Sequence, residues 1–141
     1  MKSKKLVAIS GGFDPVHVGH VRMIAEAARM GDVIIIANSD AWLMRKKGYV
    51  FMNYDERQEI LYNFKGVVDV VQASDDDGSV CKTLEKIKPD IFANGGDRKS
   101  DNVPEVALCN KLNIELVWNV GGNKIQSSSE LVANMKDKKE K

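Results

Sequence analysis

The sequence has little of several residue types, and each scarcity excludes a class of protein. Among 141 residues there are two cysteines, Cys81 and Cys109, and their spacing matches no metal or redox motif. The formal net charge is +1, so no strong overall field attracts nucleic acid or an anionic membrane. No run approaches the roughly 20 apolar residues of a transmembrane helix. We therefore expect a cytoplasmic protein without nucleic-acid or membrane partners, in which any bound anion is held by a local arrangement.

Apolar runs typical of buried strands alternate with helical patterns along the whole chain. The expected strands are 5–10, 32–39, 67–73, 90–96 and 114–120, and the expected helices are 18–30, 54–64, 79–88, 103–113 and 127–135. This alternation predicts an α/β fold, a doubly wound parallel five-stranded sheet with helices on both faces. We place one domain at residues 1–135 and a solvated tail at 136–141.

Three local signals bear on helix boundaries. Gly31 is expected at the C′ position of the first helix, where glycine commonly ends a helix. Asn53 is expected to cap the helix at 54–64, with Glu56 completing a pair that resembles a capping box. Residues 40–52 are ambiguous, and we interpret them as a short helical turn followed by a mobile basic loop.

Both histidines of the chain lie in one stretch, GGFDPVHVGH, between the first expected strand and helix. Its glycines do not have the spacing of the dinucleotide-binding fingerprint, and no nearby cysteine or glutamate completes a zinc site. His20 lies near a helix start, where free N–H groups and the helix dipole favour an anion. Two imidazoles there can donate hydrogen bonds to phosphate, although a purely structural turn remains an alternative.

Three further polar segments also follow expected strands: NSD at 38–40, NGGD at 94–97 and GGNKIQSSS at 121–129. Ligands of open α/β sheets bind beyond the carboxyl ends of the strands. We therefore expect these segments and the histidine turn to gather at one rim of the sheet.

Two motifs resemble a known family. FDPVHVGH resembles the HxGH signature of the nucleotidylyltransferase superfamily, which has a Rossmann-like fold, and IQSSSELV resembles its second signature. RQEILYNFKGVVDVV is similar to the cytidylyltransferase group within it. The resemblance implies an enzyme that joins a nucleoside triphosphate to a phosphorylated small molecule and releases pyrophosphate.

The resemblance also implies roles for individual residues. His17 and His20 would stabilise the transition state at the α-phosphate, with no general base because a phosphate monoester is already ionised at neutral pH. Lys47 and Arg57, or Lys46 in place of Lys47, would balance the charge of the departing pyrophosphate. The nucleotide would be bound by Gly11, Gly12, Phe13, Asp14, Gly19, Asn94, Gly95, Gly96, Asp97, Ser127, Ser128 and Ser129.

Structural alternatives remain for part of this set. Ser127–Ser129 could be an ordinary helix cap, Asp97 a turn residue, and Lys46 part of a solvated loop. Mg²⁺ is expected to bind mainly through the phosphates of the nucleotide, with no metal ligand assigned in the chain.

Shorter matches favour one acceptor. NSDAWLMRKKG and NGGDRK are similar to segments of heptose-1-phosphate adenylyltransferases. The glycerol-3-phosphate branch has a tryptophan where Arg98 stands and an arginine shortly before the serine cluster, where this chain has Lys124. We favour ATP and a heptose-type sugar 1-phosphate. A cytidylyltransferase using CTP and glycerol-3-phosphate, or a non-catalytic nucleotide-binding module, are the alternatives. The apolar residues of 42–52 could form a substrate lid, core or a homodimer surface.

Overall fold

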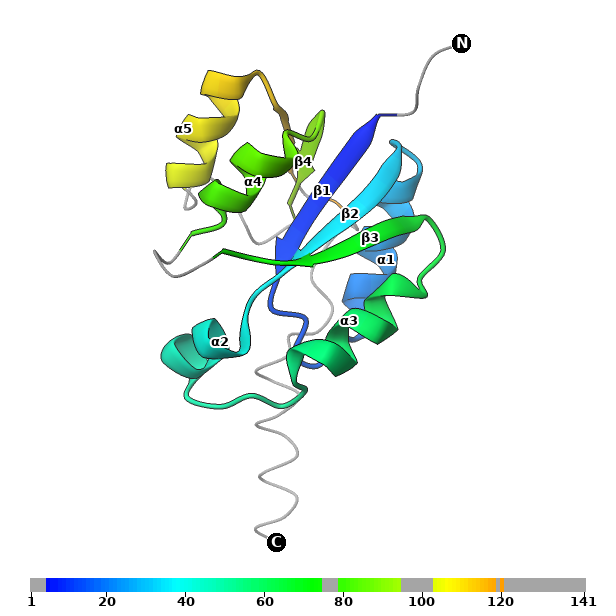
Figure 1. Cartoon of the computed structure of the whole chain (residues 1–141). Helices are drawn as coiled ribbons and strands as arrows, with labels where there is room; N and C mark the ends of the chain where they lie inside the picture. Colours follow the sequence, from blue (N-terminus) through cyan, green and yellow to red (C-terminus); the bar gives the residue numbers. More distant parts are fainter. Residues whose placement is uncertain (1–4, 75–78, 95–102, 119, 121–141) are drawn as a thin grey trace, which may run out of the picture.

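The computed structural model describes residues 5–74, 79–94, 103–118 and 120 (Figure 1). Its strands are β1 (Leu6–Gly11), β2 (Asp32–Ala37), β3 (Val67–Gln72), β4 (Ile91–Ala93) and β5 (Glu115–Val117). Its helices are α1 (Val18–Ala28), α2 (Asp40–Lys47), α3 (Tyr54–Tyr62), α4 (Cys81–Ile87) and α5 (Val103–Leu112). The helix expected at 127–135 and the tail at 136–141 lie outside the described residues.

The five strands form one parallel sheet in the order β3-β2-β1-β4-β5. The chain first builds outward from β1 through β2 to β3, and then crosses over to place β4 on the other side of β1. The strand order therefore reverses between β1 and β4, which is where an open α/β sheet offers a crevice for ligands. The predicted doubly wound parallel sheet is confirmed.

Helices cover both faces of the sheet, as Figure 1 shows. On one face, Ile24 and Ala27 of α1 and Leu61 of α3 pack in a cluster with β1 residues Val7 and Ile9. On the other face, α4 and α5 pack against the strands through a second cluster that includes Ala8, Leu84 and Cys109. Because successive strand residues point to opposite faces and both faces are covered, the central strands are continuous apolar runs rather than alternating ones.

Gly31 does not have the role that we predicted for it. Helix α1 ends at Ala28 with Arg29 as its C-cap, and Gly31 is not among the glycines with positive φ. A Cβ at Gly31 would instead lie 2.1 Å from the carbonyl oxygen of Lys5. Glycine is required here by a close approach of two backbone segments, a long-range contact that the local pattern does not contain.

The short helical turn expected at the start of residues 40–52 is longer than predicted, because the first eight residues, basic ones included, form α2. The Ser39 hydroxyl oxygen accepts a hydrogen bond from Trp42 N at 3.0 Å. Gly48, at φ +83°, ends the helix in the left-handed conformation. The basic residues Arg45–Lys47 therefore occupy the last helical turn, where positive charge is favourable.

The predicted Asn53 cap at the start of α3 is confirmed, whereas the return bond from the Glu56 side chain, expected for a capping box, is not among its capping bonds. Asn53 is the N-cap of α3, and its side-chain oxygen accepts a hydrogen bond from Glu56 N at 2.9 Å. This bond satisfies one of the amide groups that the first helical turn leaves without an intrahelical partner.

Candidate active site

The histidine turn leaves the sheet at the carboxyl end of its central strand. Gly11 pairs with Ala37 of β2 in the sheet register, and Asn38 N donates to the Gly11 carbonyl at 2.9 Å. On the other side of β1, Ile9 pairs with Ala93, the last residue of β4. The structure thus brings residues 11–20, residues 38–40 and the buried Asn94 to one rim, as expected. Residues 95–97 and 121–129 lie outside the described part of the chain.

The two histidines hold each other at the start of α1. His17 is the N-cap, and its Nδ1 accepts a hydrogen bond from Gly19 N at 3.1 Å. In return, the backbone N–H of His17 donates to His20 Nδ1 at 3.1 Å. The two rings stack, with centroids 4.0 Å apart and planes at 25°. Because Nδ1 accepts a backbone N–H in each ring, Nδ1 carries no proton and the ring proton lies on Nε2. In each imidazole the group that can donate a hydrogen bond is therefore Nε2–H.

Residues around the histidines explain why this turn has its composition. A Cβ at Gly19 would lie 2.9 Å from His17 Cε1, so glycine leaves room for the capping ring. Phe13 is buried at φ +54°, and its ring lies 4.8 Å from that of His20. The resemblance implies that Gly19 contacts the nucleotide, and the structure gives a separate reason for glycine at this position.

His20 is neutral at physiological pH. Burial, and then the neighbouring His17 and Lys47, lower the pKa of His20 from 6.5 to about 3. An imidazole with so low a pKa is a poor general base at neutral pH, but its Nε2–H remains a hydrogen-bond donor. The electrostatics therefore agree with a role in stabilising developing negative charge.

Lys47 provides positive charge near the histidines. It is half-buried at the end of α2, and burial is the main cause that lowers its pKa; Arg57 lowers it further and Asp14 opposes the shift. Lys46, the other candidate, is exposed. Of the two lysines, it is thus Lys47 whose charge acts on His20.

Asp14 fastens the histidine turn to a distant segment. Its side chain is fully buried, and its carboxylate accepts hydrogen bonds from Phe51 N at 2.7 Å and from Met52 N. The sequence hypothesis counted Asp14 among the nucleotide contacts. In the structure both carboxylate oxygens accept backbone amides of the segment between α2 and α3.

Arg57 of α3 is a second buried residue that links distant segments by hydrogen bonds. Its side chain is 0% exposed, and its Nη1 donates to the carbonyls of Gly12 and Asn38, both at 2.8 Å. A further bond joins Nε to the Met52 carbonyl at 3.0 Å, and Nη2 pairs with Asp40 Oδ1 at 2.8 Å. A contact between Arg57 and pyrophosphate requires an exposed guanidinium. The buried geometry instead favours a positioning role that ties together the ends of β1 and β2 and the start of α2.

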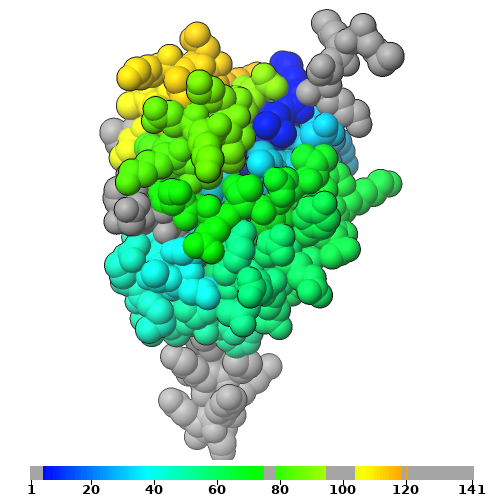
Figure 2. All heavy atoms as spheres, in the orientation of Figure 1, coloured from blue at the N-terminus to red at the C-terminus, as the bar shows by residue number. Residues whose placement is uncertain are grey.

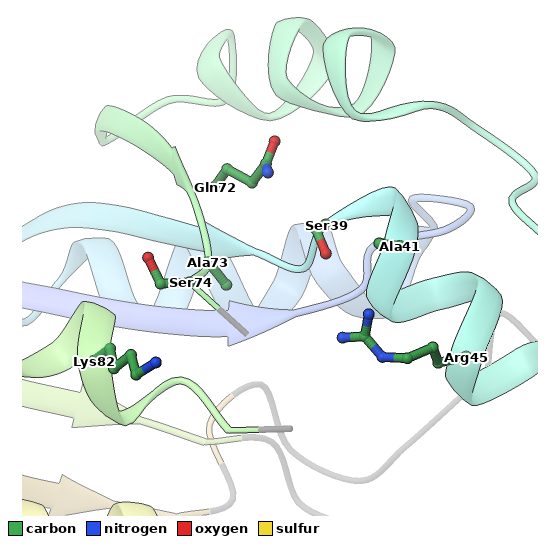
Figure 3. Close-up of a pocket in the computed structure, with 7 residues that line it drawn as sticks. All are labelled: Ser39, Ala41, Arg45, Gln72, Ala73, Ser74 and Lys82. Atoms are coloured by element: carbon green, nitrogen blue, oxygen red, sulfur yellow. The ribbon is translucent and has the colours of Figure 1, made fainter. Parts of the chain in front are cut away.

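A cavity of about 560 Å³ lies beside α2, at the carboxyl ends of β2 and β3. It is lined by Ser39, Ala41, Arg45, Gln72, Ala73, Ser74 and Lys82 (Figure 3). Sequence reasoning placed Ser39 at the ligand rim, as part of the NSD segment, but gave none of these residues a role in the site. The signal was present in part, because Ala41 and Arg45 are four residues apart and share a helix face, but only if residues 40–47 are already known to be helical.

The described residues include neither a candidate metal cluster nor a membrane-spanning helix. Within those ranges, no group of three or more histidine, cysteine, aspartate or glutamate side chains could hold a metal ion. No helix in the same ranges is long and apolar enough to cross a membrane.

The fold thus places the paired histidines at the switch point of its sheet. A model of the cytidylyltransferase-like family matches residues 8–135, so the chain belongs to that family. The resemblance seen in the two motifs is thereby confirmed.

Individual relatives give further detail. The chain is 34% identical over 140 residues to a bifunctional protein HldE of Campylobacter jejuni subsp. doylei, covering 98% of this chain and 29% of that protein. It is 34% identical over 98 residues to an FAD synthase of Ferroglobus placidus, covering 70% of this chain and 62% of that protein. The crystal structure of the lipopolysaccharide core biosynthesis protein from Thermoplasma volcanium GSS1 superposes with a TM-score of 0.70 at 25% identity, covering 86% and 98% of the two chains. The chain thus spans less than two thirds of these two curated relatives.

Proposed function

We propose that this protein transfers an adenylyl group from ATP to a heptose-type sugar 1-phosphate and releases pyrophosphate. The observation that carries the proposal is the pair of stacked imidazoles at the start of α1, in which each Nδ1 accepts a backbone amide, so that the proton of each ring lies on Nε2. The choice of acceptor is supported by the similarity to HldE proteins, one of which is 39% identical over 114 residues.

The chemistry needs charge stabilisation more than proton transfer. An oxygen of the acceptor phosphate attacks the α-phosphorus, and the bond from that phosphorus to the β-phosphate oxygen breaks, so that pyrophosphate leaves. The second pKa of a phosphate monoester is near 6, so the attacking oxygen is already ionised at neutral pH. A neutral His20 with a pKa of about 3 is suited to this reaction, because a donor is needed and a base is not.

The remaining residues divide into contacts and supports. His17 and His20 would donate to the α-phosphate as its negative charge grows, and Lys47 would balance the charge of the departing pyrophosphate. Arg57 would act by positioning the turn and α2. Gly95–Asp97 and Ser127–Ser129 remain predicted contacts of the nucleotide, and Asn94 begins the first of these segments.

Mg²⁺ would arrive on the triphosphate and supply charge neutralisation at the phosphates. An ion of this kind keeps several oxygen ligands from phosphates and water and needs no cluster of protein ligands. Gly11 and Gly12 remain proposed contacts of the phosphates, and their lack of a side chain also leaves room for the Phe13 ring and for Leu43.

The test is pyrophosphate release in the presence of Mg²⁺, with ATP or CTP supplied against heptose 1-phosphate, glycerol 3-phosphate and FMN. ATP with heptose 1-phosphate is expected to react fastest. Preference for CTP with glycerol 3-phosphate would instead identify the cytidylyltransferase alternative. This alternative is included because the matched family is described as cytidylyltransferase-like. Nucleotide binding without pyrophosphate release from any pair would indicate a non-catalytic binding module and overturn the proposal.

A further inference from the structure

Phe13 combines burial with an unusual backbone conformation. Its φ of +54° lies in the left-handed region, which is uncommon for a bulky side chain and costs free energy. Two other described residues besides glycine have a positive φ, Lys88 and Asn113, and both follow the last residue of a helix, where this conformation is common. Phe13 instead lies in the turn between β1 and α1. A bulky residue keeps such a conformation only where the surrounding structure requires it.

The conformation of Phe13 is accompanied by tight packing of its ring. The residue is 3% exposed and belongs to the apolar cluster that contains Val7, Ile9 and Ile24. A Cβ at Gly11 would lie 3.3 Å from Cε2 and from Cζ of Phe13, which is closer than ordinary van der Waals contact. The ring therefore lies directly beside the end of β1, in the space that glycine leaves there.

The same ring also contacts His20. The two ring centroids are 4.8 Å apart and the planes are tilted by 60°, within the range that aromatic pairs favour. His20 stacks in addition on His17, and its Nδ1 accepts the backbone N–H of His17 at 3.1 Å. Rotation of the His20 side chain would break these contacts. The two histidines orient each other relative to α1, and Phe13 relates the His20 ring to the end of β1.

Phe13 also helps to exclude water from His20. Burial is the largest cause of the low pKa of His20, ahead of the charges of His17, in the same turn, and Lys47, at the end of α2. Phe13 has no charge, so it acts on this pKa only through burial. Figure 2 shows residues of α2, α3 and the segment between them, in cyan to green, in front of the place where the turn leaves β1 in Figure 1. Protein therefore covers the turn on this side.

We propose that Phe13 is a positioning residue for the transfer reaction: its ring, packed between the end of β1 and His20, fixes the direction of the His20 Nε2–H and keeps water from the imidazole. The inference rests on the proposed function. It gives Phe13 a role that acts through His20 and is distinct from the nucleotide contact that the resemblance implies.

The test is Phe13→Leu, which keeps an apolar side chain and removes the ring. Phe92→Leu is the matched control, because Phe92 is 1% exposed and belongs to the cluster on the other face of the sheet. Phe13→Met is a second variant that retains more of the buried volume. For each protein we would measure kcat and KM for ATP by pyrophosphate release, and the midpoint of thermal unfolding.

NMR titration of the histidine rings without substrate completes the comparison. The chain has two histidines, so the signal that disappears in His17→Asn identifies His17 and the other signal belongs to His20. This measurement reports on the surroundings of His20 whether or not the protein turns over a substrate.

Both Phe13 variants are expected to lower kcat by about 10- to 100-fold, as when a reacting group is slightly misplaced, with little change in KM for ATP. The pKa of His20 should rise from about 3 toward 6.5 as water reaches the ring. Phe92→Leu should lower the unfolding midpoint by a similar amount to Phe13→Leu but leave kcat and the His20 titration unchanged.

Two results would overturn the inference. One is a Phe13→Leu protein that loses stability like Phe92→Leu but keeps wild-type kcat and an unchanged His20 titration, since Phe13 would then be an ordinary core residue. The other is a His20 that titrates near 6.5 in the wild type. Absence of pyrophosphate release from the wild type with every acceptor would instead contradict the proposed function, while the NMR comparison would still decide whether Phe13 shields His20.

Discussion

The histidine turn and helix α2 lie on the same rim of the sheet but are stabilised in different ways. In the turn, His17 and His20 are held by hydrogen bonds to backbone groups no more than three residues away. Helix α2 is held at its first turn by Arg57, which lies 17 residues further along the chain than Asp40. The geometry of the histidine turn is therefore determined by hydrogen bonds within a short motif. The position of α2 depends instead on contacts with residues far away in the sequence. Three predictions follow from this difference.

The largest effect is expected from His20→Asn, with His17→Asn as its companion. Asparagine carries an oxygen close to the position of Nδ1, so each variant keeps the acceptor that holds the turn and loses the Nε2–H donor. We expect kcat for pyrophosphate release to fall by about 10²- to 10³-fold, as when one donor to a developing oxyanion is removed. The midpoint of thermal unfolding should stay close to that of the wild type.

His20→Gln is the matched control for this prediction. Glutamine places an amide near the position of Nε2 but has no acceptor at that of Nδ1, so it should keep more of the turnover and lose some stability. Wild-type turnover in His20→Asn would show that the Nε2–H does not act on the substrate.

Arg57→Lys should act mainly on stability. Lysine cannot reproduce the planar fork that reaches Gly12, Asn38 and Asp40 together, and buried carbonyls would lose their donors. We expect the free energy of unfolding in urea to fall by about 2–3 kcal/mol. Arg22→Lys on the exposed surface of α1 is the control and should change it by less than about 0.5 kcal/mol.

The same variant separates two roles for Arg57. If Arg57→Lys keeps its full stability yet loses turnover, the arginine acts on the phosphates, as the sequence hypothesis has it. Loss of stability together with a reduced kcat supports the positioning role.

The smallest effect concerns pH. The pKa of His20 is about 3 in the folded protein, against an ordinary value of 6.5 when the chain is unfolded. Between these values the unfolded chain binds a proton that the folded chain does not, so stability falls as the pH drops from 6.5 toward 3. This single group contributes at most about 1.4 kcal/mol per pH unit.

Urea unfolding of wild type and His20→Asn at pH 7, 6 and 5 would measure this contribution, since asparagine does not titrate. The wild type should lose more stability over this interval than the variant does. Parallel curves for the two proteins would contradict the lowered pKa.

The local pattern was informative where a few neighbouring residues make the structure. The Asn53 cap is one example, because it needs only an amide three residues away. The central strands are another example. Residues 33–37 form an unbroken apolar run, which indicates a strand covered on both faces, and all five residues are buried. The histidine turn belongs with them, and so it could be singled out before any coordinates were known.

Other features could not be read from the chain because their cause lies far away in sequence. Gly31 needs no side chain because Lys5 approaches it, and Asp14 accepts amides of Phe51 and Met52. The helical state of residues 40–47 depends on Ser39 and Gly48 as caps and on Arg57 packing against its first turn. The cavity beside α2 then follows from these contacts.

Amino-acid order alone therefore determined the alternation of strands and helices, the parallel sheet, and the pair of histidines that marks the chemistry, because each depends on short-range pattern and burial. Only the tertiary structure decided that Arg57 is buried and links distant segments. It also decided that the charge of Lys47, and not that of Lys46, acts on His20, and that Arg45 and Lys82 border one cavity. These depend on segments far apart in the chain being packed together, and the energy of such contacts exists only once the sheet has assembled.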